Sequence, residues 1–169
     1  LKALYLVGGA NCEIPDGLWN LPGGSLRELG LYGFSRIQVP VSVSKWSVLE
    51  DLSLGNAVMA PSDIEAIKNL NLTDLMIYSP VFGQSGLPAW LGGMSSIEYL
   101  TLFDCGITSI PESFSGLTGL RDLDIPRNPN LTGILPTGLL ERYNAGELYV
   151  YAPESKDFSP DGTWLEVTP

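Results

Sequence analysis

The chain has 169 residues, 44% of them hydrophobic, which suits one folded domain of ordinary size. Its 19 acidic and 9 basic residues give a formal net charge of -10, which disfavours nucleic acid and anionic membrane surfaces as partners. Histidine, the commonest general base and metal ligand, is absent, so we expect no enzymatic activity, no metal and no cofactor. No stretch reaches about 18 apolar residues, so we expect no membrane insertion of this segment.

A pattern of leucine, two residues, leucine, one residue and leucine recurs along the chain, with apolar substitutes. The repeats start near residues 1, 26, 49, 72, 97, 120 and 145, so successive starts lie 23 or 25 residues apart. The triplets are Leu1-Leu4-Leu6, Leu26-Leu29-Leu31, Leu49-Leu52-Leu54, Leu72-Leu75-Ile77, Ile97-Leu100-Leu102, Leu120-Leu123-Ile125 and Ala145-Leu148-Val150. Side chains alternate faces in a strand, so the fourth and sixth positions should point inward and the third, fifth and seventh outward.

Two segments carry a resemblance to the leucine-rich-repeat family. IEYLTLFDCGITSIP has Cys105 where the family uses Asn or Cys, and LRDLDIPRNPNLTGILP has Asn128 there. The stretches SIPESFSGLTG and NLTGILPTGLL are similar to extracellular repeats with an LxGxIP motif. The resemblance implies an α/β solenoid, a horseshoe or right-handed superhelix with a concave parallel β-sheet and short 3-10, helical or irregular convex segments. It covers residues 1–152, and we expect 153–169 to be a C-terminal cap or the start of a following segment.

Other repeats depart from the family pattern at the position of Asn128. Gly9, Phe34, Ala57 and Pro80 stand at or near places where an Asn side chain would bond neighbouring backbone. We therefore expect irregular turns there.

Two of the return segments are predicted to be helical. Ser62-Asp63-Ile64-Glu65 has the spacing of a capping box and predicts a helix through about Asn69. A second helix is expected near Thr137 to Tyr143. Proline and glycine favour turns and extended pieces in the other return segments.

The outward positions place an acidic row beside an aromatic one. The third positions include Glu28, Asp51, Asp74, Tyr99, Asp122 and Glu147; the seventh include Tyr32, Tyr78, Phe103 and Tyr151; the fifth add Asp124 and Tyr149. Aromatic side chains supply rigid contact area, and carboxylates steer basic surfaces, so these residues predict a protein-binding face. The simpler interpretation is that an acidic protein fills solvated positions with Asp and Glu.

The cysteines and two Asn-Leu-Thr triplets are weaker signals. Stacking separates Cys12 in the first repeat from Cys105 in the fifth by about 19 Å, whereas a disulfide needs Cα atoms within about 7 Å. We expect Cys105 to be buried and Cys12 to be a small core filler. Asn71 and Asn130 begin N-glycosylation acceptor triplets, which matter only on a eukaryotic secretory route.

The leading hypothesis is a recognition module of a secreted or cell-surface protein that binds a partner protein, with a basic surface, on its concave face. The alternative is a structural subunit that self-assembles through its N-terminal edge, because no polar cap precedes Leu1, Leu4 and Leu6. Missing upstream residues of a longer protein would explain the same edge. A glycosidase-like carboxylate pair, formed by Asp122 and Asp124 near Asp74 or Glu147, is a distant third, because an open sheet offers no closed pocket.

Overall fold

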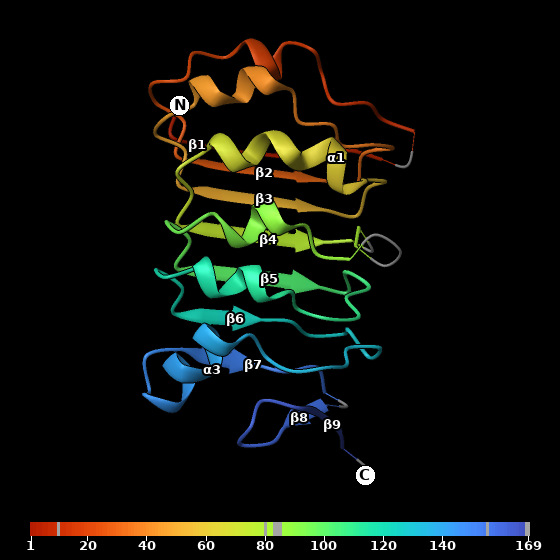
Figure 1. Cartoon of the computed structure of the whole chain (residues 1–169). Helices are drawn as coiled ribbons and strands as arrows, with labels where there is room; N and C mark the ends of the chain where they lie inside the picture. Colours follow the sequence, from red (N-terminus) through yellow and green to blue (C-terminus); the bar gives the residue numbers. More distant parts are fainter. Residues whose placement is uncertain (10, 80, 83–85, 155, 168–169) are drawn as a thin grey trace.

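The computed structural model describes residues 1–9, 11–79, 81–82, 86–154 and 156–167. These residues form a seven-stranded parallel sheet in which each strand pairs with the next in sequence (Figure 1). The strands are β1 (Ala3–Val7), β2 (Glu28–Tyr32), β3 (Asp51–Gly55), β4 (Asp74–Tyr78), β5 (Tyr99–Phe103), β6 (Asp122–Asp124) and β7 (Tyr149–Tyr151). The strands alternate with short helices, so the fold is α/β.

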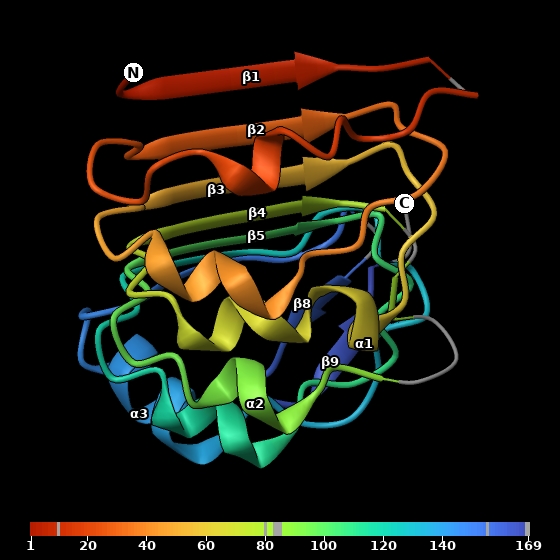
Figure 2. The same cartoon turned by 90° about the horizontal axis from the view of Figure 1, so that it is seen from above.

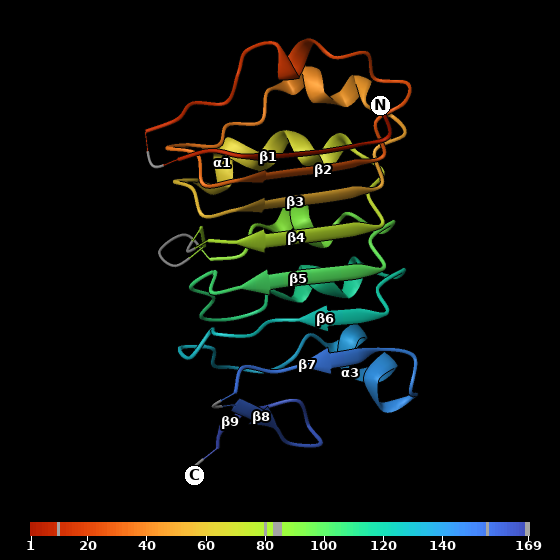
Figure 3. The ribbon, with the colours of Figure 1, turned by 180° about the vertical axis from the view of Figure 1, so that it is seen from behind.

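The helical segments lie on one face of the sheet (Figure 2). The α-helices are α1 (Pro61–Ile64), α2 (Ala89–Gly92) and α3 (Thr137–Asn144), and the 3-10 helices are η1 (Leu18–Asn20), η2 (Val41–Lys45), η3 (Glu65–Asn69) and η4 (Glu112–Gly116). The other face carries no helix in the described part of the chain and is seen in front in Figure 3. We call it the open face.

The core lies between the sheet and the helices. Paired positions on successive strands bring the fourth-position leucines into one buried row: Leu29, Leu52, Leu75, Leu100 and Leu123. Trp46, Phe82 and Phe114 are the largest fully buried side chains. Burial of the leucine row and of these aromatic side chains stabilises the stack by roughly 25 cal/mol for each Å² of apolar surface removed from water.

The turns that follow the strands are more regular than expected. Gly33, Asn56, Asp104 and Arg127, each just before the Asn128-equivalent position, all have positive φ values, of 71°, 51°, 50° and 53°. The prediction of irregular turns is therefore wrong after β2 and β3, because a left-handed residue sets the turn whether or not an Asn follows it. Phe34 is buried and fills core space instead. Pro80 lies outside the described residues.

Asn128 and Cys105 occupy the buried positions predicted for them. The Asn128 amide contacts three carbonyl oxygens and accepts two backbone N–H groups; its partners are Leu102, Ile125, Pro126, Cys105 and Ile107. Burial raises the pKa of the Cys105 thiol to about 12, so this thiol is protonated at neutral pH. Both cysteines are free, but Cys12 is exposed, so the prediction that it fills the core is wrong. The stretch between β1 and η1 is largely exposed and offers no core layer at that point.

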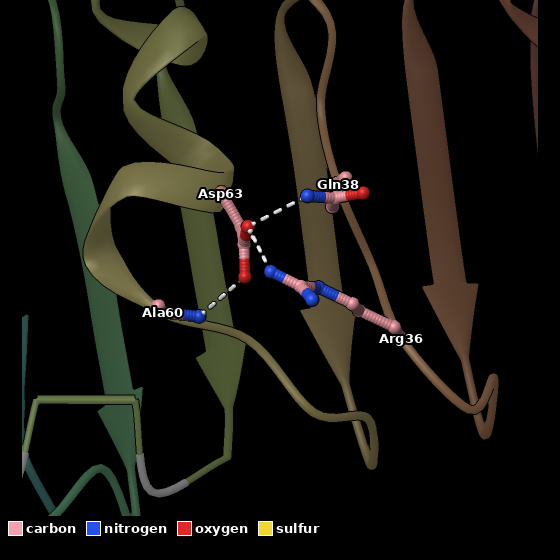
Figure 4. Close-up of polar contacts among 4 residues, drawn as sticks. All are labelled: Arg36, Gln38, Ala60 and Asp63. Atoms are coloured by element: carbon pink, nitrogen blue, oxygen red, sulfur yellow. Dashed lines mark hydrogen bonds and ion pairs between the residues drawn. The ribbon is translucent and has the colours of Figure 1, made fainter.

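The helix after β3 begins earlier than the sequence pattern predicts. Its N-cap is Ala60, not Ser62, and the residue three positions on is Asp63, not Glu65. The Asp63 carboxylate accepts the Ala60 N–H at 2.8 Å, Arg36 at 2.7 Å and Gln38 at 3.0 Å (Figure 4). A proline at the first helical position favours this start, and the segment continues as η3 through Asn69.

The second predicted helix is confirmed as α3, but the strand after it is shifted. Asp122 pairs with Tyr149, and Asp124 pairs with Tyr151. The sequence pattern had placed Glu147 opposite Asp122, two residues too early. Helix α3 ends at Asn144, and Gly146, two residues later, has a φ of 75°. Because the helix and this left-handed turn occupy residues up to Gly146, the strand begins later than predicted. A shift of two preserves the facing of side chains, so Tyr149 and Tyr151 still point outward.

The C-terminal segment forms an antiparallel hairpin of β8 (Lys156–Phe158) and β9 (Trp164–Glu166). The Phe158 ring lies 4.8 Å from that of Tyr143 on α3 and 5.2 Å from that of Trp164, centroid to centroid. Backbone bonds from Leu135 to Gly162 and from Trp164 to Gly133 attach the hairpin to the loop before α3. The hairpin thus packs against the last helix of the sheet (Figure 1).

Candidate functional site

The strand register gathers the predicted binding residues on the open face. Glu28, Asp51, Asp74, Tyr99 and Asp122 occupy one continuous row across β2 to β6. Tyr32, Gly55, Tyr78 and Phe103 form the parallel row at the carboxyl ends of β2 to β5. The register shift puts Tyr149 at the end of the acidic row and Tyr151 beside Asp124.

Glu147 does not belong to this face as predicted. It lies in the bend between α3 and β7, exposed, with its N–H bonded to the Arg142 carbonyl. The acidic row therefore ends at Asp122.

An aromatic cleft of about 530 Å³ opens at the carboxyl ends of β2 to β5. Its lining is Tyr32, Asn56, Ala57, Tyr78, Ser79, Phe103 and Asp104. The Tyr78 and Phe103 ring centroids lie 5.6 Å apart at an interplanar angle of 42°. Gly55 makes room for the rings on either side, because a Cβ there would lie 2.8 Å from the Tyr78 Cβ and 3.3 Å from the Tyr32 ring. A glycine inside the aromatic row is thus part of how the cleft is built.

Four cleft residues, Asn56, Ala57, Ser79 and Asp104, were not predicted as binding residues from the sequence. Asn56 and Asp104 are the left-handed turn residues described above, and Ser79 accepts the Ala57 N–H at 3.3 Å. For Asn56 and Asp104 the sequence did offer a signal, because Asn and Asp adopt positive φ more readily than other side chains. Strand periodicity carries no information on them, since they follow the last strand position.

A second, smaller hollow of about 330 Å³ lies over β4 to β7. We call it the acidic hollow; its lining is Asp74, Met76, Tyr99, Leu100, Thr101, Asp122, Asp124 and Tyr151. Burial, followed by repulsion from Asp122 and Glu154, raises the pKa of Asp124. The ion pairs formed within the described ranges leave out all three carboxylates of this hollow. In the part of the chain that the structure describes, none of these three carboxylates is paired with a basic side chain.

Asp51 and Asp74 face each other on β3 and β4. Burial, a hydrogen bond that the protonated Asp51 carboxyl group donates to the Asp74 carboxylate, and repulsion by the Asp74 charge raise the pKa of Asp51 to about 6. Above about pH 6 Asp51 is mainly ionised, and repulsion between the two facing carboxylates then opposes folding, while a cation would relieve it.

Replacing Asp74 with Asn tests this coupling. A raised folded-state pKa adds stability below the unfolded pKa of about 4, and that stability is lost as the pH rises through about 6. We expect Asp74→Asn to lower the pKa of Asp51 and to make the free energy of unfolding fall less between pH 4 and pH 8. Carboxyl carbon chemical shifts and urea unfolding measure the two effects. An unchanged Asp51 titration in the variant would show that the carboxyls are independent; Glu147→Gln, remote from the pair, is the control.

The two candidate glycosylation asparagines, Asn71 and Asn130, are both exposed. Neither lies in a strand of the open face. Neither asparagine lines the aromatic cleft or the hollow over β4 to β7.

The described residues contain no group of three His, Cys, Asp or Glu side chains placed to hold a metal ion. Within the same ranges, no helix has both the length and the apolar character needed to cross a bilayer. No known protein-family profile matches the chain, and no curated protein sequence is recognisably similar to it.

Proposed function

We propose that the chain is a leucine-rich-repeat solenoid that serves as a non-catalytic protein-binding module of a secreted or cell-surface protein. The open face is its binding surface. The observation that carries this proposal is the sheet face that no described helix covers, on which aromatic rings and carboxylates without an ion pair among the described residues lie together around two hollows. Aromatic side chains dominate the energy of protein interfaces, and charged groups around them control approach and selectivity.

The repeat assignment is supported by the buried leucine row and by the Asn128 hydrogen bonds. One strand per repeat, stacked in sequence order, buries a core that no single repeat could bury alone. The bonds of Asn128 to backbone on both sides of the turn suit the role of Asn in this family's turns.

A protein partner suits the surface better than a small molecule. The hollows are open to the sheet face and follow one another along β4 and β5, so a ligand that fills both must be extended. The net charge of -10 and the acidic row favour a partner with a basic surface.

Selection of binders from a library of random twelve-residue peptides on the immobilised protein tests the proposal. We expect selected peptides to lose about tenfold in affinity for Tyr78→Ala, because a central aromatic contact typically contributes 1 to 2 kcal/mol. The matched control is Val41→Ala, which removes an apolar side chain that is 79% exposed on η2, on the helical side. Binders that lose affinity for Val41→Ala but not for Tyr78→Ala would show that binding occurs on the helical side, which would contradict the proposal.

A second candidate function is assembly through strand β1. In the described structure β1 pairs with β2 along one edge only, and Leu1 and Val7 are 69% and 79% exposed. An unpaired strand edge with apolar side chains can accept another strand, including one from a second copy. Sedimentation velocity over a wide concentration range separates the two functions: growth in mass with concentration favours assembly, and a constant monomer mass excludes it.

A further inference from the structure

We propose that the open face holds an extended, basic peptide segment, with a cationic side chain in the acidic hollow and an apolar side chain two residues away in the aromatic cleft. This inference rests on the proposed function and specifies the chemistry of the partner. The partner is thus expected to carry a basic and an apolar side chain two residues apart.

The acidic hollow has the chemistry of a receptor for a guanidinium or ammonium group. Asp74 on β4 and Asp122 on β6 lie on either side of Tyr99 on β5, and Asp124 lies beside Thr101, a small side chain on the same strand. Asp122 and Asp124 lie two residues apart on one strand, so both face the same side and repel each other, and a bound cation relieves that repulsion. Tyr99 and Tyr151, which are 43% and 55% exposed, add ring faces on which a guanidinium can stack.

The aromatic cleft favours a different side chain because a cation already borders it. The Arg127 guanidinium carbon lies 5.2 Å from the centroid of the Phe103 ring. Asp104 also lines the cleft, but Arg127 already supplies the cation that stacks on the Phe103 ring, and an aliphatic or aromatic side chain can pack against Tyr32 and Tyr78. The chain thus separates a cationic subsite from an apolar one.

The spacing of the subsites follows from β5, which lines both. Thr101 lies in the acidic hollow and Phe103 in the aromatic cleft, two residues apart on one strand. Two residues of extended chain span about 7 Å, and side chains two apart point to the same side. An extended partner alongside β5 therefore presents its apolar and basic side chains at positions i and i+2.

Synthetic peptides test the inference directly. The first has leucine and arginine at i and i+2 in a glycine-serine background, the second has them adjacent, and the third replaces arginine with uncharged citrulline. We expect fluorescence anisotropy to show the first peptide binding about tenfold more tightly than the citrulline peptide and about fivefold more tightly than the adjacent one. Equal affinities for arginine and citrulline would overturn the cationic subsite, and equal affinities for the two spacings would overturn the extended register.

Charge-matched variants separate the hollow from the general field of the protein. The double variant Asp122→Asn/Asp124→Asn should lose the preference for arginine over citrulline, while Glu141→Gln/Glu147→Gln, with the same net charge change outside the hollow, should keep it. Loss of the preference in both double variants would mean that only the net charge acts, which overturns the subsite. Thr101→Tyr, which fills the hollow and keeps its charges, should also weaken arginine binding and provides a second test if the asparagine variant folds poorly.

Failure here is distinguishable from failure of the proposed function. Library binders that depend on Tyr78 but show no need for arginine would overturn the subsite inference and leave the binding module standing. Binders that ignore Tyr78 would overturn the module itself.

Discussion

Asn128→Ala is expected to destabilise the protein by about 3 kcal/mol, because it removes a buried amide that bonds to five backbone groups. The Cys105 and Ile107 N–H groups would lose their acceptor at a fully buried position. Each buried donor or acceptor left without a partner costs about 1 to 3 kcal/mol, and entry of water into the space offsets part of the sum. Urea unfolding followed by circular dichroism measures the change.

Asn130→Ala is the matched control, since Asn130 is exposed and lies two residues away in the same turn. It should change the free energy of unfolding by no more than about 0.5 kcal/mol. Equal, small effects of both substitutions would show that the Asn128 amide does not hold the turn after β6 to the turn after β5.

Asp63→Asn is expected to cost about 2 kcal/mol near neutral pH, because it weakens the bonds from Arg36, Gln38 and the Ala60 N–H together. These bonds join the segment after β2 to the start of α1 (Figure 4). Burial alone would raise the pKa of Asp63, but the bonds from Arg36, Gln38 and Ala60 outweigh it and lower the pKa below its usual value. Urea unfolding measures the change.

The sign of the pH dependence follows from that lowered pKa. The stabilisation is fully present above the unfolded pKa of about 4 and is lost as the pH falls through the lower folded value. The difference between wild type and Asp63→Asn should therefore shrink in strong acid. Asp16→Asn, at an exposed position, should show no such difference; a gap for Asp63→Asn that stays constant into acid would contradict the ionic role.

The leucine pattern predicted six of the seven strand positions because side-chain alternation and burial fix the register. Leu29 and Leu52, for instance, must both face the helices, and a slip by one residue would expose the whole row. The seventh strand was predicted two residues too early, because Ala145 matches an apolar position in the pattern but belongs to the end of α3. The local preference of the helix and its Gly146 end outweighed a weak strand signal.

The residues of the candidate site also fall into those that the sequence predicts and those that it does not. Tyr78, Phe103 and the aspartates were predictable, since outward strand positions follow from the register. The turn residues Asn56 and Asp104 were not, because their place depends on backbone torsion after the strand. The space beside Gly55 was also unpredictable, because it depends on the side-chain conformations of Tyr32 and Tyr78 on the two neighbouring strands.

The most direct test of the binding-module proposal is a map of amide chemical shifts in the ¹⁵N-labelled protein as the leucine-arginine peptide is added. We predict that the largest changes fall on the strands of the open face, with Thr101, Phe103 and Asp124 among them, and that Val41–Lys45 of η2 stays unchanged. Changes concentrated on the helical side, or along β1, would contradict the assignment of the open face as the binding surface.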